Sequence, residues 1–148
     1  MNKFFTFLVA VAVVFPIVLK AESTIYVFDN YPFQKIAGLS FNGDEISLAD
    51  RPLLKEKMGM KEYVKGLTKI TVKNDGRLLV VRDFEWAGKP YHDEMTIDLN
   101  DGDVYYLELV SGSKSTLKLL KAQDGEKKLR ELPKKKDWTV FPDQSYDK

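Results

Sequence analysis

The chain has a single histidine, His92, and two acidic residues, Asp93 and Glu94, follow it directly. A histidine beside a carboxylate could serve as a general base or as part of a metal site. Neighbouring residues of an extended chain point to opposite faces, so His92 and Asp93 do not converge by themselves. The sequence nearby supplies no recognisable nucleophile. We therefore interpret His92 as a solvated loop residue.

Four carboxylates flank the same region, and a facing pair of them could hydrolyse envelope material, as paired carboxylates do in glycosidases. This is the enzymatic alternative. The motifs of serine hydrolases, phosphate-binding loops and zinc proteases (G-x-S-x-G, GK[ST] and H-E-x-x-H) do not occur in the sequence. We predict no catalytic residue, no metal and no cofactor. The four carboxylates are Asp83, Glu85, Asp93 and Glu94.

A second acidic cluster invites a calcium interpretation, because Asp98, Asn100, Asp101 and Asp103 surround Gly102. An EF-hand loop needs glycine at its sixth position and glutamate at its twelfth. Counted from Asp98, the glycine is fifth and the twelfth residue is a leucine, so the register fails. Asn, Asp and Gly also tolerate the backbone angles of tight turns. We favour a turn over an ion site.

Aromatic residues stand on two predicted loops at strand ends, Tyr31 and Phe33 on one, and Trp86 and Tyr91 on the other, which spans residues 85–92. Aromatic side chains on loops can hold a ligand or partner, although they more commonly close the open end of a sandwich core. These four residues are the predicted partner contact.

The N-terminus has the pattern of a secretory signal peptide. Lys3 precedes an apolar run from Phe4 to Leu19, and small residues follow at Ala21 and Ser23. As a helix the run would reach roughly 24 Å, short of the ~30 Å hydrocarbon core of a bilayer. We expect cleavage near Ala21 and a place in the periplasm or outside the cell. An uncleaved anchor, which would tether a structural domain, is the alternative.

Composition excludes several classes of function. Residues 22–148 hold 21 basic and 22 acidic side chains, so the surface offers no general attraction to nucleic acid. The basic segment from Lys127 to Lys136 is diluted by acids, and we interpret it as solvated, with contact to an anionic envelope polymer as the alternative. The chain has no cysteine, which excludes disulfides, thiol catalysis and a lipid-modified N-terminus.

Short alternating runs separated by Gly and Asp turns predict an all-β fold, an antiparallel β-sandwich of about seven to nine short strands. Residues 23–28 are apolar on both faces, as in a strand covered on two sides. Asn42-Gly43 is a favoured hairpin turn, and Asp75-Gly76 and Asp101-Gly102 predict two further hairpins. A last strand is expected around residues 129–132. The domain spans 22–132.

Two stretches leave alternatives open. Asp50, Pro52 and the apolar spacing after them allow a short helix near 51–58, and a loop with an irregular strand through Tyr63-Val64 fits equally. Residues 133–148 form a polar and basic C-terminal tail that we expect to lie loosely on the surface. Within that tail, Trp138, Val140 and Phe141 could instead dock as an edge strand.

The sequence resembles a family of small bacterial exported domains with a PEGA-like β-sandwich layout. The residues that support the resemblance are the opening strand 25–28, the turn glycine Gly76 before the run 77–81, and Gly102 before the paired Tyr105-Tyr106. The family's usual proline before the hairpin glycine is replaced by Asp75. The resemblance implies a β-sandwich in the cell envelope and transfers no catalytic residue. We therefore expect an exported, non-enzymatic domain that binds an envelope protein or a surface polymer.

Overall fold

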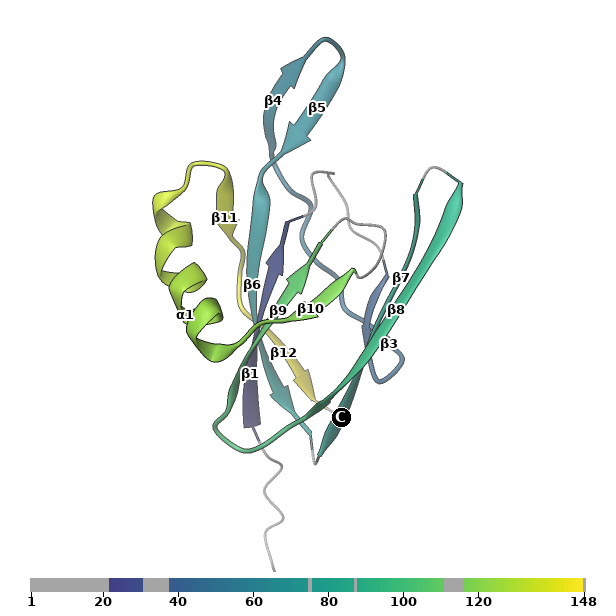
Figure 1. Cartoon of the computed structure of the whole chain (residues 1–148), viewed down its shortest axis with the longest axis vertical. Coiled ribbons are helices and arrows are strands. Elements are labelled where there is room, and N and C mark those ends of the chain that lie inside the picture. Colours follow the sequence, from purple (N-terminus) through teal and green to yellow (C-terminus); the bar gives the residue numbers. More distant parts are fainter. Residues whose placement is uncertain (1–21, 31–37, 75, 87, 111–115, 148) are drawn as a thin grey trace, which may run out of the picture.

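The computed structural model describes residues 22–30, 38–74, 76–86, 88–110 and 116–147. In these residues the chain forms twelve strands in three sheets and one short α-helix, so the predicted all-β, sandwich-like class is confirmed (Figure 1). The number of strands exceeds the predicted seven to nine because several of them are only two to four residues long.

The larger sheet has six strands in the order β10-β9-β1-β6-β11, with β12 also paired to β6. Strand β1 lies at its centre, antiparallel to β6 and parallel to β9, and both C-terminal strands run parallel to β6. The expectation of a purely antiparallel sandwich is therefore wrong for this sheet. Its strands are β1 (Glu22–Asp29), β6 (Lys65–Lys73), β9 (Val104–Leu109), β10 (Leu117–Leu119), β11 (Trp138–Val140) and β12 (Gln144–Asp147).

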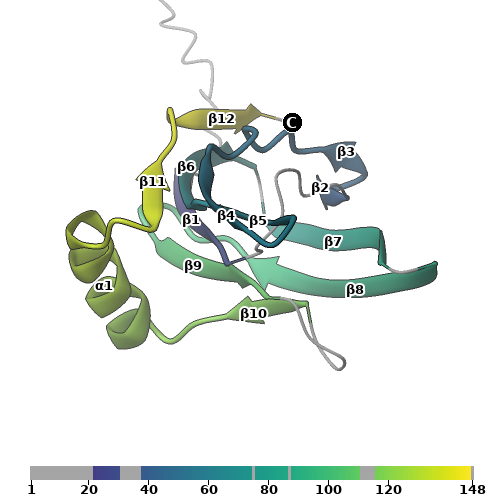
Figure 2. The same ribbon diagram turned by 90° about the horizontal axis from the view of Figure 1, so that it is seen from above.

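The second sheet has four antiparallel strands in the order β3-β2-β7-β8 and packs against one face of the first (Figure 2). Its strands are β2 (Leu39–Phe41), β3 (Asp44–Glu45), β7 (Arg77–Trp86) and β8 (Lys89–Asp98). The third sheet is a hairpin of two strands, β4 (Leu53–Lys57) and β5 (Met60–Tyr63), which stands above the sandwich in Figure 1.

Strand β1 is apolar on both faces because both faces are covered, as its sequence predicted. Ile25 and Val27 lie in the core between the two sheets. Phe28 lies on the other face, where it is buried with Tyr106 under the helix α1 (Ala122–Glu131) and the turn that follows at Leu132. The molecule thus has three layers: a helix, the six-stranded sheet and the four-stranded sheet.

The two predicted Asp-Gly hairpins are wrong in their pairing. Gly76 and the Asp101-Gly102 turn do lie between strands, but each connects one sheet to the other. Strand β6 pairs with β1 and not with β7, and β9 pairs with β1 and not with β8. Turn residues specify a reversal of the chain, whereas the pairing is decided by which apolar faces bury one another.

The proposed helix near residues 51–58 is also wrong, since β4 and β5 occupy this stretch as a hairpin. The cause lies in the burial of the side chains. All five residues of β4 are exposed, so no apolar face is buried that could stabilise one helical turn, and short helices depend on such packing.

A helix, α1, occupies the residues around 129–132 where a last strand was predicted. Gly125, Leu129 and Leu132 follow a helical spacing and face the six-stranded sheet. A Cβ atom at Gly125 would come within 2.1 Å of the Tyr106 ring, so glycine permits this close approach. Glycine has a low intrinsic helix propensity, and the helix was therefore not predicted from the sequence.

The C-terminal segment does not lie loosely on the surface. Strands β11 and β12 complete the edge of β6, and the alternative in which Trp138 and Val140 dock as an edge strand is the observed one. Phe141 packs its ring over Gly66, and the buried Tyr146 packs against Phe41 of the other sheet.

The predicted signal peptide, residues 1–21, lies outside the described residues. Among the residues that the structure does describe, no helix has the length and apolar character needed to cross a membrane.

Candidate functional site

The candidate site is the far end of the β7–β8 hairpin. The predicted loop 85–92 is almost entirely strand: β7 continues to Trp86 and β8 begins at Lys89. Strand β2 pairs with β7 only from Val80 to Arg82. Beyond that point the two strands of the hairpin pair with each other in the described sheets and reach past their neighbours (Figures 1 and 2).

The inner face of this hairpin carries a row of stacked side chains. The rings of Phe84 and Tyr91, which are cross-strand partners, lie 5.0 Å apart and nearly parallel. The Arg82 guanidinium lies 4.5 Å from the Phe84 ring centroid. Phe84 and Tyr91 are both only partly buried. The row therefore extends the apolar core outward and ends in an aromatic surface that solvent reaches.

The base of the row is a buried polar seam between the two sheets. Arg82 is fully buried, and its Nη1 donates to the carbonyl oxygens of Val110 at 3.0 Å and Thr116 at 2.7 Å. The carboxylate of Asp93, its cross-strand partner, accepts hydrogen bonds from the backbone N–H groups of Thr116 at 2.8 Å and Leu117 at 3.1 Å. These bonds fix the hairpin to the start of β10 and make the base of the site rigid.

The outer face of the hairpin places His92 between two carboxylates. Its Nδ1 contacts Asp83, the cross-strand partner, and its Nε2 lies 3.4 Å from Oε2 of Glu94. The hydrogen bond to Asp83 and then the charge of Asp83 raise the pKa of His92 above its ordinary value of about 6.5. His92 is exposed, as expected, but it lies on a strand and not in a loop.

The four carboxylates of the enzymatic alternative are divided between the two faces of the hairpin, and Glu85, two residues after Asp83 on β7, lies on the outer face. Asp93 lies on the inner face, where it binds the backbone of the other sheet. Asp83 and Glu94 share the outer face with His92, and their side chains are 64% and 61% exposed. A general acid in a glycosidase is usually set up by an apolar, water-poor surround. The outer face gives Asp83 and Glu94 no such surround.

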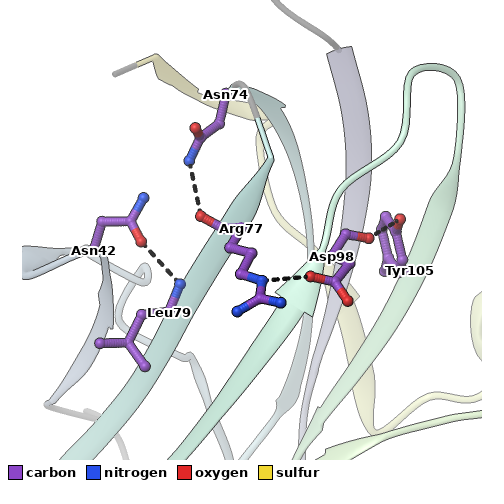
Figure 3. A network of polar contacts seen from close by, with 6 residues as sticks. All are labelled: Asn42, Asn74, Arg77, Leu79, Asp98 and Tyr105. Carbon is purple, nitrogen blue, oxygen red and sulfur yellow. Dashed lines mark hydrogen bonds and ion pairs between the residues drawn. The ribbon is translucent and has the colours of Figure 1, made fainter.

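The opposite end of the same hairpin holds a small polar network (Figure 3). Arg77 pairs with Asp98 across the strands at 3.1 Å, both side chains being largely exposed. The Tyr105 hydroxyl donates to the Asp98 carbonyl oxygen at 2.7 Å. The Asn42 side chain accepts a hydrogen bond from the Leu79 N–H at 2.8 Å, which ties the β2–β3 turn to β7.

The acidic cluster at 98–103 forms a turn, as the sequence analysis favoured. The Asp101 carboxylate accepts a hydrogen bond from the N–H of Glu22 at 2.9 Å, and Asp103 donates its N–H to the Asn100 carbonyl. In the described part of the chain, no group of three or more His, Asp or Glu side chains is arranged to hold a metal ion.

Of the four predicted contact residues, two are placed by the structure. Tyr91 lies at the end of the stacked row, and the backbone of Trp86 closes β7. Tyr31 and Phe33 lie outside the described residues.

Sequence reasoning missed Arg82 and the stacking of Phe84 on Tyr91. A signal for Arg82 was present: it shares its strand face with Leu78, Val80 and Phe84, so alternation alone places a charged residue among buried positions. The pairing of Phe84 with Tyr91 needs the hairpin register, which the prediction of a loop concealed.

A comparison of the chain with protein-family models, with curated proteins and with solved structures finds no match.

Proposed function

We propose that this chain is an exported, non-enzymatic β-sandwich domain that binds another envelope protein or a surface polymer through the far end of its β7–β8 hairpin. The observation that supports the proposal best is the stacked row that ends at Tyr91. Partly exposed aromatic side chains at the end of a rigid arm are the usual anchors of a binding surface.

Two further observations support the proposal. The signal-like pattern of residues 1–21 and the resemblance to small exported domains both favour an envelope setting. The seam at Arg82 and Asp93 holds the hairpin in place before a partner arrives, so binding would order few additional groups.

The test is affinity capture from an envelope fraction with the wild-type chain, Trp86→Ala and Tyr91→Ala. We expect each variant to lose at least about tenfold of the captured partner, because truncating an interface anchor costs on the order of 2 kcal/mol or more. Val140→Ala, at an exposed apolar position on the other sheet, is the matched control and should capture normally. Unchanged capture by both aromatic variants rules this surface out.

A further inference from the structure

The β4–β5 hairpin exposes more large apolar side chains than any other element that the structure describes. Among the described residues, eight large apolar side chains are exposed, and four of them belong to this hairpin. Met58 is 91% exposed and Met60 is 74% exposed. Isolated exposed apolar residues are ordinary, but a cluster at the end of one element marks an interaction site. Met58 and Met60 form this cluster at the turn, whereas the other two exposed residues, Leu53 and Leu54, lie at the base of the hairpin, where Leu53 pairs with Tyr63.

The turn at the tip is built with an unfavourable residue. Met58 has a φ of 53° and Gly59 a φ of 77°, as the central positions of a two-residue hairpin turn require. Glycine and asparagine accept such angles readily, whereas a long side chain such as methionine does so at a cost. Local structure therefore does not explain methionine at this position.

Another hairpin of the same chain has asparagine and glycine, the residues usually found in a turn of this type. The β2–β3 hairpin turns at Asn42 and Gly43 with φ values of 49° and 86°, between strands paired in the same way. The two turns differ in environment: Asn42 binds Leu79 of β7, while the β4–β5 hairpin stands clear of the two sheets in Figure 1. The methionine at the free turn thus points to a role outside the fold.

The charged residues around the tip of the β4–β5 hairpin indicate which kind of surface the tip binds. Lys57 and Lys61 flank the sequence Met58-Gly59-Met60 on both sides; Lys57 lies opposite Met60, and Lys61 lies opposite Glu56, one pair further from the turn. Glu62 forms an ion pair with Lys55 at 3.0 Å. Apolar side chains at a tip with a lysine on each side match the layering of an anionic membrane surface, in which phosphate groups lie above the acyl chains.

We propose that the β4–β5 tip inserts into the surface of an anionic lipid bilayer. Met58 and Met60 enter the boundary between head groups and acyl chains, and Lys57 and Lys61 contact lipid phosphates. A thin convex hairpin has no groove of its own to receive a partner, but a soft lipid phase can accommodate its tip. This docking involves a different surface from the β7–β8 hairpin and does not depend on the function proposed above.

The test uses the absence of cysteine from the chain, which allows a single label. Met60→Cys in the otherwise unchanged chain is labelled with an environment-sensitive fluorophore, and Val140→Cys gives the matched control on another exposed strand. Vesicles of phosphatidylglycerol and phosphatidylcholine are titrated into each sample. We expect the label at position 60 to shift to a membrane-like emission with the anionic vesicles, while the label at position 140 does not.

Two changes near the label test the roles of the side chains. Met58→Asn keeps the turn, as Asn42 does in the other hairpin, and should weaken the response about tenfold. Lys57→Gln combined with Lys61→Gln should weaken it by roughly tenfold or more at low salt.

A water-like emission at position 60 with anionic vesicles overturns the proposal, and so does an equal shift at position 140. A response that survives Met58→Asn, or that is equal with vesicles of pure phosphatidylcholine, overturns it as well. Protection of the tip by an envelope protein, with no response to vesicles, would assign this hairpin to a protein partner instead.

Discussion

His92 illustrates how a single residue acquires its properties from strand register. Asp83 is its cross-strand partner and Glu94 is two residues further along the same strand, so both carboxylates share its face of the sheet. The raised pKa of His92 means that the folded state favours the protonated ring. When the pH rises and His92 loses its proton, the free energy of unfolding therefore falls.

The titration of His92 should make the stability of the folded domain depend on pH. A folded-state pKa above the unfolded value gives a stabilising contribution that is fully present below about pH 6.5 and is lost as the pH rises through the folded pKa. We expect the free energy of unfolding to fall across that window. Proton NMR follows the one histidine directly, and urea unfolding on both sides of the window measures stability.

Asp83→Asn is the control for this titration. It removes the charge and keeps a polar side chain, so the pKa of His92 should move back toward its ordinary value and the change in stability with pH should shrink. An unchanged titration midpoint in Asp83→Asn contradicts the assignment.

At the scale of elements, the helix α1 depends on one close contact with the sheet. Gly125 is buried against Tyr106, and Leu132 is buried in the same cluster beneath the helix. Lys128 adds an ion pair with Glu108 of β9, and its Nζ lies 5.4 Å from the Phe28 ring centroid. Burial raises the pKa of Tyr106, with a further contribution from the charge of Glu126. The helix is thus held by packing more than by its own sequence.

Gly125→Ala tests this close contact. In an exposed helix, replacing glycine with alanine stabilises by about 0.8–1 kcal/mol. Here the added methyl group meets the Tyr106 ring, and we expect a loss of about 1–3 kcal/mol, as for other overpacked sites. Urea denaturation measures the difference. Gln123→Ala, at an exposed position of the same helix, should change stability little, and a gain in stability by Gly125→Ala would show that the contact is not tight.

The elements also show what sequence can predict. Alternation identified β1, β6, β7, β9 and the second half of β8, and the Asn42-Gly43 turn follows from local chemistry. The first half of β8 was predicted as a loop, and its residues are exposed or only partly buried. The β4–β5 hairpin and α1 were missed because their signals conflict with local propensity: a methionine at a turn and a glycine inside a helix. The sheet-to-sheet connections at Gly76 and Gly102 depend on distant pairing, which no short window of sequence contains.

For the molecule as a whole, the last strand joins the two sheets. The Tyr146 hydroxyl lies 3.0 Å from the Phe41 carbonyl oxygen and 2.9 Å from Oδ2 of Asp44, both in the four-stranded sheet. Its ring packs edge-on against Phe41. Burial and then the hydrogen bond to Asp44 raise the pKa of Tyr146. The C-terminal segment is therefore part of the core and not an appendage.

Tyr146→Phe should lower the free energy of unfolding of the whole domain by about 1–2 kcal/mol, because the one hydroxyl proton that the Phe41 carbonyl and the Asp44 carboxylate share is lost. A single cooperative transition at a lower urea concentration is the expected result. Tyr91→Phe, which alters a hydroxyl on the projecting hairpin, should stay within about 0.5 kcal/mol of wild type. A local loss of β12 with an unchanged main transition would contradict the role of Tyr146.

The parallel pairing of β11 and β12 with β6 affects the timing of folding. Strand β12 closes the edge of a sheet whose centre is β1, so the native arrangement needs segments that lie far apart in the sequence. Long-range pairing of this kind folds slowly. If the polypeptide is exported as proposed, this delay keeps the chain unfolded for longer, and a translocation channel can receive it before the large sheet has assembled.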